Sequence, residues 1–155
     1  MTTVAVRDGV MAADTLLIRS EVRCSIGKIF RRDYGLVGGA GSRSDILRLL
    51  EWYDGDRRGK PDFVGYGDDR PEVDLLILER DGGLVVISQY LVITRLREPF
   101  FAIGSGAAAA LGAMHAGCDA RRAVEIAARV DVNTQEPVEW ATLDELPARR
   151  RRRAG

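Results

Sequence analysis

The sequence has few of the residues on which catalytic and metal sites most often depend. Among 155 residues it holds a single histidine, His115, and two cysteines, Cys24 and Cys118. Neither a Cys-x-x-Cys pair nor a histidine cluster occurs, so we expect no metal and no cofactor. Two distant cysteines without a pairing motif predict buried, reduced thiols in a cytoplasmic protein.

A serine elbow is also missing. A Ser-His-Asp hydrolase built on His115 would need such an elbow to expose its nucleophile. His115 is more simply explained as a residue that stabilises the C-terminal end of a helix through the helix dipole. Any hydrolytic chemistry is therefore expected to use other groups.

Long hydrophobic runs and an excess of one charge are absent as well. The longest uncharged stretch, residues 100–118, is mostly alanine and glycine, and no signal peptide opens the chain, so we expect no membrane partner.

Basic and acidic residues number 23 each, but five arginines lie together at residues 149–153. The remaining body is mildly acidic, which argues against a nucleic-acid partner. The arginine run is typical of a solvated tail, here residues 147–155, although it could also bind an acidic partner.

The composition predicts one domain of ordinary size. Hydrophobic residues make up 46% of the chain and charged residues 30%, which is typical of a globular protein with a real core. We expect this domain to cover residues 1–146.

The first fourteen residues predict a hairpin that starts almost at the chain terminus. Residues 2–7 are rich in β-branched side chains, Asp8-Gly9 is a strong two-residue turn signal, and residues 10–13 run back. This return brings the carboxylate of Asp14 close to Thr2.

The rest of the chain predicts strands first, then a helix, further strands and two more helices. Strands are expected at residues 15–18, 21–26, 34–37, 73–79, 84–90, 91–96, 100–103 and 137–140. Residues 38–41 are expected to form a glycine turn, and residues 54–72 an irregular connection. Helices are expected at residues 42–53, at 104–116 with Gly117 as the terminating residue, and after the capping residue Asp119. This order favours an α+β domain with largely antiparallel sheets.

Thr2 has a chemical property of its own. Once Met1 is removed, its hydroxyl can act as a nucleophile while its own α-amine, with a reference pKa of about 7.7–8.0, accepts the proton. A histidine is not required for this chemistry.

Five motifs occur in a fixed order: Thr2-Thr-Val-Ala-Val, Ala12-Ala-Asp, Lys28-Ile-Phe-Arg-Arg, Val37-Gly-Gly-Ala-Gly and Ala102-Ile-Gly-Ser-Gly. Together they resemble proteasome β-type subunits, and most closely the HslV-type peptidases among the N-terminal-nucleophile hydrolases. The resemblance covers residues 2–134. It implies a four-layer αββα sandwich, a cytoplasmic threonine peptidase with a polypeptide substrate, and a homo-oligomer.

The resemblance also implies a role for individual residues. Thr2 would be the nucleophile, with Asp14 and Lys28 as its charged support, which agrees with the effect of an ammonium on a nearby hydroxyl. Gly38 would stabilise the oxyanion through its backbone N–H. The remaining site residues, which would orient the terminal amine and its surroundings, would be Ser105, Asp131 and Thr134.

One stretch departs from the family pattern. Two long helices usually follow the glycine segment, whereas only one is predicted here, and residues 54–72 replace the other. Because rings in the family pack through these helices, ring closure and docking of an ATPase unfoldase both remain open.

The sequence also allows three other interpretations. The chain could be a catalytically silent assembly or binding module, which would fit retention of Met1, or an amidase of the same fold that acts on small amides. Gly104-x-Gly106-x-x-Ala109 also matches a dinucleotide fingerprint, but Glu125, at the spacing of the ribose-binding acid, lies inside a predicted helix.

Overall fold

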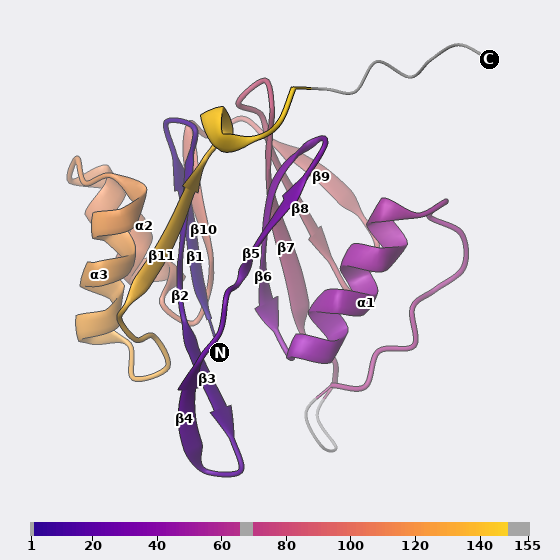
Figure 1. The fold of residues 1–155 in the computed structure, drawn as a ribbon, viewed down its shortest axis with the longest axis horizontal. Coiled ribbons are helices and arrows are strands. Elements are labelled where there is room, and N and C mark those ends of the chain that lie inside the picture. Colours follow the sequence, from indigo (N-terminus) through magenta and orange to yellow (C-terminus); the bar gives the residue numbers. More distant parts are fainter. Residues whose placement is uncertain (1, 66–69, 149–155) are drawn as a thin grey trace.

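A computed structural model of the chain describes residues 2–65 and 70–148 (Figure 1). Its strands are β1 (Thr3–Arg7), β2 (Val10–Asp14), β3 (Leu16–Arg19), β4 (Val22–Ser25), β5 (Ile29–Arg32), β6 (Gly35–Gly41), β7 (Val73–Glu79), β8 (Leu84–Ser88), β9 (Ile93–Leu96), β10 (Phe100–Gly104) and β11 (Val138–Thr142). Its helices are α1 (Arg43–Asp54), α2 (Ala107–His115) and α3 (Ala120–Val130), with a short 3-10 helix at Leu143–Glu145. Met1 and residues 149–155, which include the arginine run of the predicted tail, lie outside the described residues.

Two antiparallel sheets face each other and form the middle of the molecule. The first has the strand order β10-β1-β2-β11, and the second has the order β5-β6-β7-β8-β9. Helices α2 and α3 cover the outer face of the first sheet, and α1 covers the outer face of the second (Figure 1). This is a four-layer αββα sandwich, so the predicted fold class is confirmed. A third sheet, the two-stranded hairpin β3–β4, projects from one end (Figure 1).

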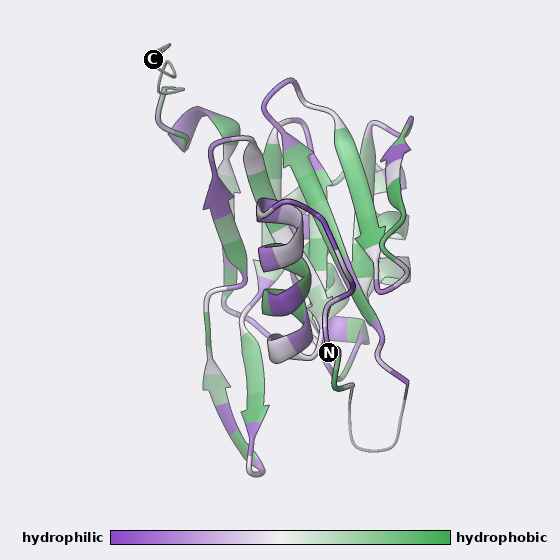
Figure 2. Cartoon of the chain, turned by 90° about the vertical axis from the view of Figure 1, so that its right-hand side faces the viewer, coloured by the Kyte–Doolittle hydropathy of each residue, from purple (hydrophilic) through white to green (hydrophobic). Residues whose placement is uncertain are grey.

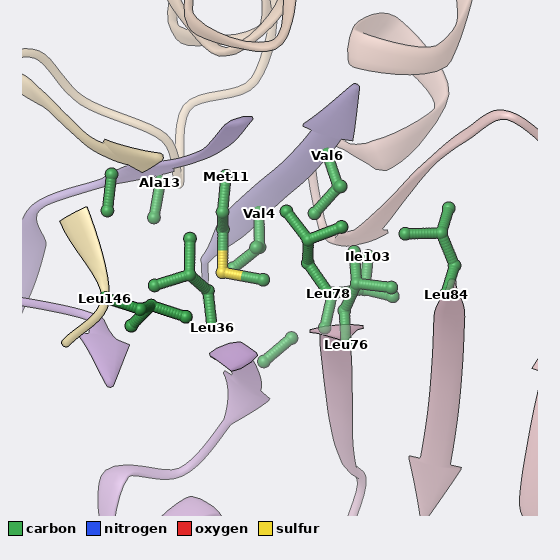
Figure 3. Packing of buried hydrophobic residues seen from close by; sticks show 12 residues of the cluster. Val4, Val6, Met11, Ala13, Leu36, Leu76, Leu78, Leu84, Ile103 and Leu146 are labelled. Carbon is green, nitrogen blue, oxygen red and sulfur yellow. The ribbon is translucent and has the colours of Figure 1, made fainter. Parts of the chain in front are cut away.

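Aliphatic side chains from both sheets fill the space between the two layers (Figure 3). The twelve buried residues are Val4, Val6, Met11, Ala13, Leu36, Ala40, Leu76, Leu78, Leu84, Ile103, Ala141 and Leu146. Burying each of the larger side chains is worth about 1.5–3 kcal/mol, so this layer is a major source of stability. It holds β1 and β2, and therefore the start of the chain, against the second sheet.

The two helical layers use different residues. Alanine dominates where α2 and α3 meet the first sheet, with Ala5, Ala12 and Ala102 opposite Ala110, Ala123 and Ala127. Such small side chains allow a close approach of helix and sheet. The α1 layer uses larger residues, as its apolar positions predict, and Ile46, Leu49, Leu50 and Tyr53 are all buried. Figure 2 shows the apolar strands of the second sheet behind the more polar outer face of α1.

The predicted N-caps of α1 and α3 and the glycine after α2 are confirmed, but α2 begins at Ala107 and not at residue 104, because Gly104 is the last residue of β10. Ser42 is the N-cap of α1 and accepts a hydrogen bond from the Asp45 amide at 3.2 Å. Asp119 is the N-cap of α3 and accepts one from the Arg122 amide at 2.7 Å. Gly117 follows α2 with φ +99°, the left-handed conformation that a glycine adopts without strain.

The predicted glycine turn at residues 38–41 is wrong. These residues are the second half of β6, which lies between β5 and β7 in the second sheet. A Cβ on Gly38 would lie 2.5 Å from Val4 Cγ1, and one on Gly39 would lie 2.5 Å from Ile46 Cγ2. Glycine fits here because side chains pack closely on both faces of the strand, Val4 on one side and Ile46 on the other, and not because the chain turns.

Other expectations need smaller corrections. The predicted strand at residues 84–90 ends at Ser88, because Leu91 has φ +62° and separates β8 from β9. Cys24 is exposed and Cys118 is half-buried, so the expectation that both thiols are buried is wrong.

The described part of the 54–72 connection contains no helix or strand after Asp54, as predicted. Within residues 2–65 and 70–148, none of the helices has the length and apolar character needed to cross a membrane.

Candidate active site

The first hairpin places Asp14 next to the start of the chain, as predicted. Strands β1 and β2 pair antiparallel with Val4 opposite Ala13, and the turn residues Asp8 and Gly9 both have positive φ. The fully buried Asp14 accepts a hydrogen bond from the Thr3 amide at 2.8 Å and another from the Leu16 amide at 3.1 Å. These two bonds fix the carboxylate in one orientation.

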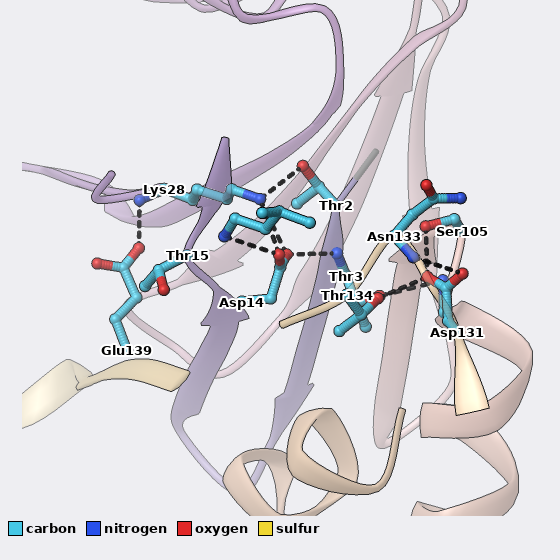
Figure 4. Close-up of polar contacts among 12 residues, drawn as sticks. Thr2, Thr3, Asp14, Thr15, Lys28, Ser105, Asp131, Asn133, Thr134 and Glu139 are labelled. Carbon is cyan, nitrogen blue, oxygen red and sulfur yellow. Dashed lines mark hydrogen bonds and ion pairs between the residues drawn. The ribbon is translucent and has the colours of Figure 1, made fainter. Parts of the chain in front are cut away.

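Lys28 connects this carboxylate to the Thr2 hydroxyl (Figure 4). Its Nζ lies 3.0 Å from each Asp14 carboxylate oxygen and 3.1 Å from Thr2 Oγ1. An ammonium group has three N–H donors, and these three contacts account for all of them. Only 5% of Lys28 and 4% of Thr2 are exposed, so the contacts are shielded from water.

Two opposing effects set the pKa of Lys28. Burial disfavours the charged amine, while the Asp14 carboxylate favours it through charge and hydrogen bonding. Burial is the larger effect, so the pKa of Lys28 lies below the usual lysine value. Lys28 is therefore a hydrogen-bond donor held beside the Thr2 oxygen. Its charge state depends on the charged groups around it, above all on Asp14.

A second hydrogen-bond network lies on the other side of the Thr2–Thr3 backbone (Figure 4). Asp131 Oδ2 accepts hydrogen bonds from Ser105 Oγ and Thr134 Oγ1, both at 2.6 Å. Thr134 Oγ1 also lies 2.6 Å from Thr3 Oγ1, which accepts from the Gly106 amide at 3.0 Å. Because each hydroxyl has one proton, Thr3 donates to Thr134, which donates to Asp131.

This network also sets the ionisation of Asp131. Burial alone would raise its pKa, but hydrogen bonds from Ser105, Thr134 and the Asn133 amide outweigh that effect. The pKa of Asp131 therefore lies below the usual aspartate value, and the group is a stable acceptor near neutral pH.

The Gly104-Ser105-Gly106 motif is explained by contact with the first residues of the chain. A Cβ on Gly104, which has φ +98°, would lie 1.7 Å from the Thr2 carbonyl oxygen, and one on Gly106 would lie 2.3 Å from Thr3 Oγ1. The Ser105 amide donates to the same Thr2 carbonyl at 3.0 Å. The dinucleotide interpretation is therefore wrong, because β10 pairs antiparallel with β1 and its glycines pack on Thr2 and Thr3.

A cavity of about 150 Å³ opens beside Thr2 and Lys28. Apolar side chains form most of its wall, namely Leu16, Leu17, Ile18, Ile26, Phe30 and Ile46. Arg43 supplies a charge, and Gly39 and Gly41 leave backbone uncovered. A ligand in this cavity would reach the Thr2 hydroxyl with an apolar group beside it.

Gly38, the predicted oxyanion residue, does not itself line this cavity. It pairs with Ile29, and its Cα faces Val4 and Met11 in the core between the sheets. The cavity is lined by Gly39 and Gly41 instead. Pairing of β5 with β6 ends at Gly38, so beyond it the edge of β6 is no longer covered by β5.

Glu139 is a site residue that the sequence analysis missed. From β11 it accepts a hydrogen bond through Oε1 from the Lys28 amide (Figure 4). The same oxygen accepts a second hydrogen bond, from the Ile29 amide, at 2.6 Å. Nothing in the sequence around Glu139 signals this, because the contact joins residues more than a hundred positions apart.

The other candidates remain outside this site. His115 is exposed at the end of α2, and its ring lies edge-on to Phe100 with centroids 4.8 Å apart. Across residues 2–65 and 70–148, no group of three or more His, Cys, Asp or Glu side chains is placed to hold a metal ion.

The αββα architecture is the one that the sequence resemblance implied, and Thr2, directly before β1, lies at the site. Among solved structures, the chain is similar to BPH of Thiobacillus denitrificans, with a TM-score of 0.63 and 23% identity over 90% of this chain and 95% of that chain. BPH in complex with epoxomicin gives a TM-score of 0.64 at 23% identity, over 90% and 96% of the two chains. Eukaryotic HslV from Trypanosoma brucei gives 0.65 at 22% identity, over 91% and 98%.

These likenesses show the fold, which is that of the proteasome-like and HslV-like peptidases. No protein-family model and no curated protein matches the sequence. The resemblance of the five sequence motifs and the similarity of the structures therefore agree on the architecture.

Proposed function

We propose that this protein is a threonine peptidase in which Thr2, exposed by removal of Met1, is the nucleophile. The observation that supports this most directly is the Lys28 ammonium, which contacts both the Thr2 hydroxyl and the buried Asp14 carboxylate. A buried lysine–aspartate pair is costly to desolvate, and a role at Thr2 Oγ1 explains its presence there.

The reaction begins with attack of Thr2 Oγ1 on the carbonyl carbon of a peptide bond. The hydroxyl proton passes to the α-amine of Thr2, and the new C–O bond gives a tetrahedral oxyanion. The C–N bond then breaks, the leaving amine takes the proton from the α-amine, and the acyl group remains on Thr2 as an ester. Water, deprotonated by the same amine, hydrolyses the ester and restores Thr2.

Lys28 and Asp14 assist the first step through charge. The ammonium favours the developing negative charge on Thr2 Oγ1, and Asp14 favours the protonated form of the lysine. The network of Ser105, Asp131 and Thr134 holds the Thr2–Thr3 backbone, and through it the α-amine, in a fixed position.

The oxyanion needs an amide donor that faces the cavity. Gly39 and Gly41 line the cavity and Gly38 does not, which favours the amides of the Gly39–Gly41 segment over the Gly38 amide. Glycine suits this position because no side chain obstructs a carbonyl that approaches the backbone.

The wall of the cavity favours a polypeptide substrate with an apolar side chain next to the bond that is cut. Six aliphatic or aromatic residues surround the space beside Thr2. The similar BPH protein is in complex with epoxomicin, which we use below as a probe. We further propose a cytoplasmic homo-oligomer, while an ATPase partner remains open.

The intact mass of protein expressed with its natural start tests the first requirement. We expect a mass lower by one methionine, and hydrolysis of fluorogenic peptides with an apolar residue before the leaving group. Peptides with an acidic residue there, and small amides, should be cut more slowly. Retention of Met1 with no hydrolysis would contradict the proposal and favour a silent binding module, and preferential cleavage of small amides would favour an amidase.

A further inference from the structure

Glu139 connects the two sheets through hydrogen bonds next to Lys28. The Lys28 side chain reaches Asp14 in the first sheet, while its backbone leads into β5, the edge strand of the second sheet. Glu139 lies on β11, paired with Ala13 next to Asp14. Its carboxylate accepts the amides of both Lys28 and Ile29, so β11 is connected to the start of β5.

We propose that Glu139 is a positioning residue for Lys28, which fixes the backbone from which the ammonium reaches Thr2. This inference rests on the proposed function of Thr2 and Lys28. The carboxylate accepts hydrogen bonds from two adjacent backbone N–H groups at one oxygen, Oε1.

The charge of Glu139 has a second consequence for Lys28. The charged groups that act on the Lys28 amine are Asp14 and Glu139, which favour its protonated form, and Arg43, which disfavours it. Removal of the Glu139 charge leaves Asp14 alone against burial and Arg43. The pKa of Lys28 should therefore fall further when Glu139 is neutralised.

The composition of the chain allows a direct measurement of this effect. Lys28 and Lys60 are the only lysines, so protein labelled with ¹³C-lysine gives two Cε signals, and the exposed Lys60 is an internal control. In Glu139→Gln, which keeps an acceptor oxygen, we expect the Lys28 titration to move to lower pH. Lys60 should not move.

Activity gives the second readout. Glu139→Ala removes both hydrogen bonds, and we expect kcat for peptide hydrolysis to fall about tenfold with little change in KM, the loss expected for a charged hydrogen-bond acceptor. Glu139→Gln should lose less and should show an alkaline limb at lower pH. Glu145→Gln is the matched control, because Glu145 pairs with exposed Arg31 away from the site.

The outcomes separate this inference from the proposed function. If the unchanged protein hydrolyses peptides but both Glu139 variants behave like Glu145→Gln, the positioning role is wrong and the function stands. If the unchanged protein is inactive but Glu139→Gln still moves the Lys28 titration, the function fails and the coupling of Glu139 to Lys28 stands. An unmoved Lys28 titration in Glu139→Gln would overturn the coupling directly.

Discussion

Lys28 Nζ lies 3.1 Å from Thr2 Oγ1, although 26 positions separate the two residues in the chain and they precede strands of different sheets, β5 and β1. The Asp14 carboxylate, 3.0 Å from the same nitrogen, balances the lysine charge within a buried site. One lysine thereby links the terminal hydroxyl to an internal counter-ion. This arrangement leads to predictions for both chemistry and stability.

Replacement of Lys28 should abolish most of the activity and weaken the fold. Lys28→Met keeps much of the side-chain length but leaves Asp14 buried without its partner, which costs about 3–5 kcal/mol. Loss of the ammonium that stabilises the charge developing on Thr2 Oγ1 should lower kcat/KM for peptide hydrolysis by about 10²–10³-fold. Denaturant unfolding and steady-state kinetics measure the two effects. Lys60→Met, at an exposed position, should match the unchanged protein in both, and equal losses in the two variants would contradict the assignment.

Neutralisation of Asp14 should narrow the pH range of activity from the alkaline side. The carboxylate raises the pKa of Lys28 against the effect of burial, so Asp14→Asn lowers that pKa further. Lys28 then loses its proton at a lower pH, and the alkaline limb of kcat/KM moves down with it. A pH–rate profile measures this shift. An alkaline limb that stays in place would show that Lys28 does not control it.

The sequence predicted the local elements well because their signals are local. Asp8-Gly9 specifies the hairpin that returns Asp14 to Thr2, and both turn residues have the positive φ that such a turn requires. The spacing of Ile46 and Tyr53 specified the buried face of α1. The charged pair at Thr2 was found through its likeness to a family, since no spacing rule brings residues 14 and 28 together.

The parts that the sequence did not predict depend on packing between layers. In the sequence, Gly38 and Gly39 are typical of a turn. In the structure, the absence of a side chain at these two positions leaves room for Val4 and Ile46, which pack on either side. Glu139 carries no motif, and its role depends on the register of β11 against β2. These contacts between residues distant in the sequence depend on how the sheets pack, so no local sequence pattern predicts them.

The packing account of Gly38 makes a stability prediction. In Gly38→Ala the added methyl group would overlap Val4, and overpacking of this kind costs about 1–3 kcal/mol. Gly112→Ala is the matched control, because nothing lies within 4 Å of its added Cβ. Gly112 lies inside α2, where alanine should stabilise by roughly 0.5–1 kcal/mol. Thermal or denaturant unfolding should give opposite signs, and two changes of the same sign would contradict this account.

Asp131 should contribute to stability in a defined pH range. Its pKa in the folded protein lies below the usual value of about 3.9 that it has in an unfolded chain. The contribution is therefore complete above that value and is lost as the pH falls through the folded pKa. Asp131→Asn should be less stable than the unchanged protein at pH 7, with a smaller difference near pH 2.

Denaturant unfolding at a series of pH values measures this dependence. Asp144→Asn serves as the control, since Asp144 is exposed and lies in the short 3-10 helix after β11. A stability difference for Asp131→Asn that stays constant down to pH 2 would show that its ionisation is not responsible.

The most direct test of the central claim is the site at which epoxomicin attaches. Protein without Met1 is incubated with epoxomicin, and tandem mass spectrometry of the N-terminal peptide locates the added mass. We predict one adduct per chain, on Thr2, absent from Thr2→Ala and slowed by Lys28→Met. An adduct on any other residue, or an unmodified Thr2 in a folded chain that lacks Met1, would contradict the claim that this threonine is the nucleophile.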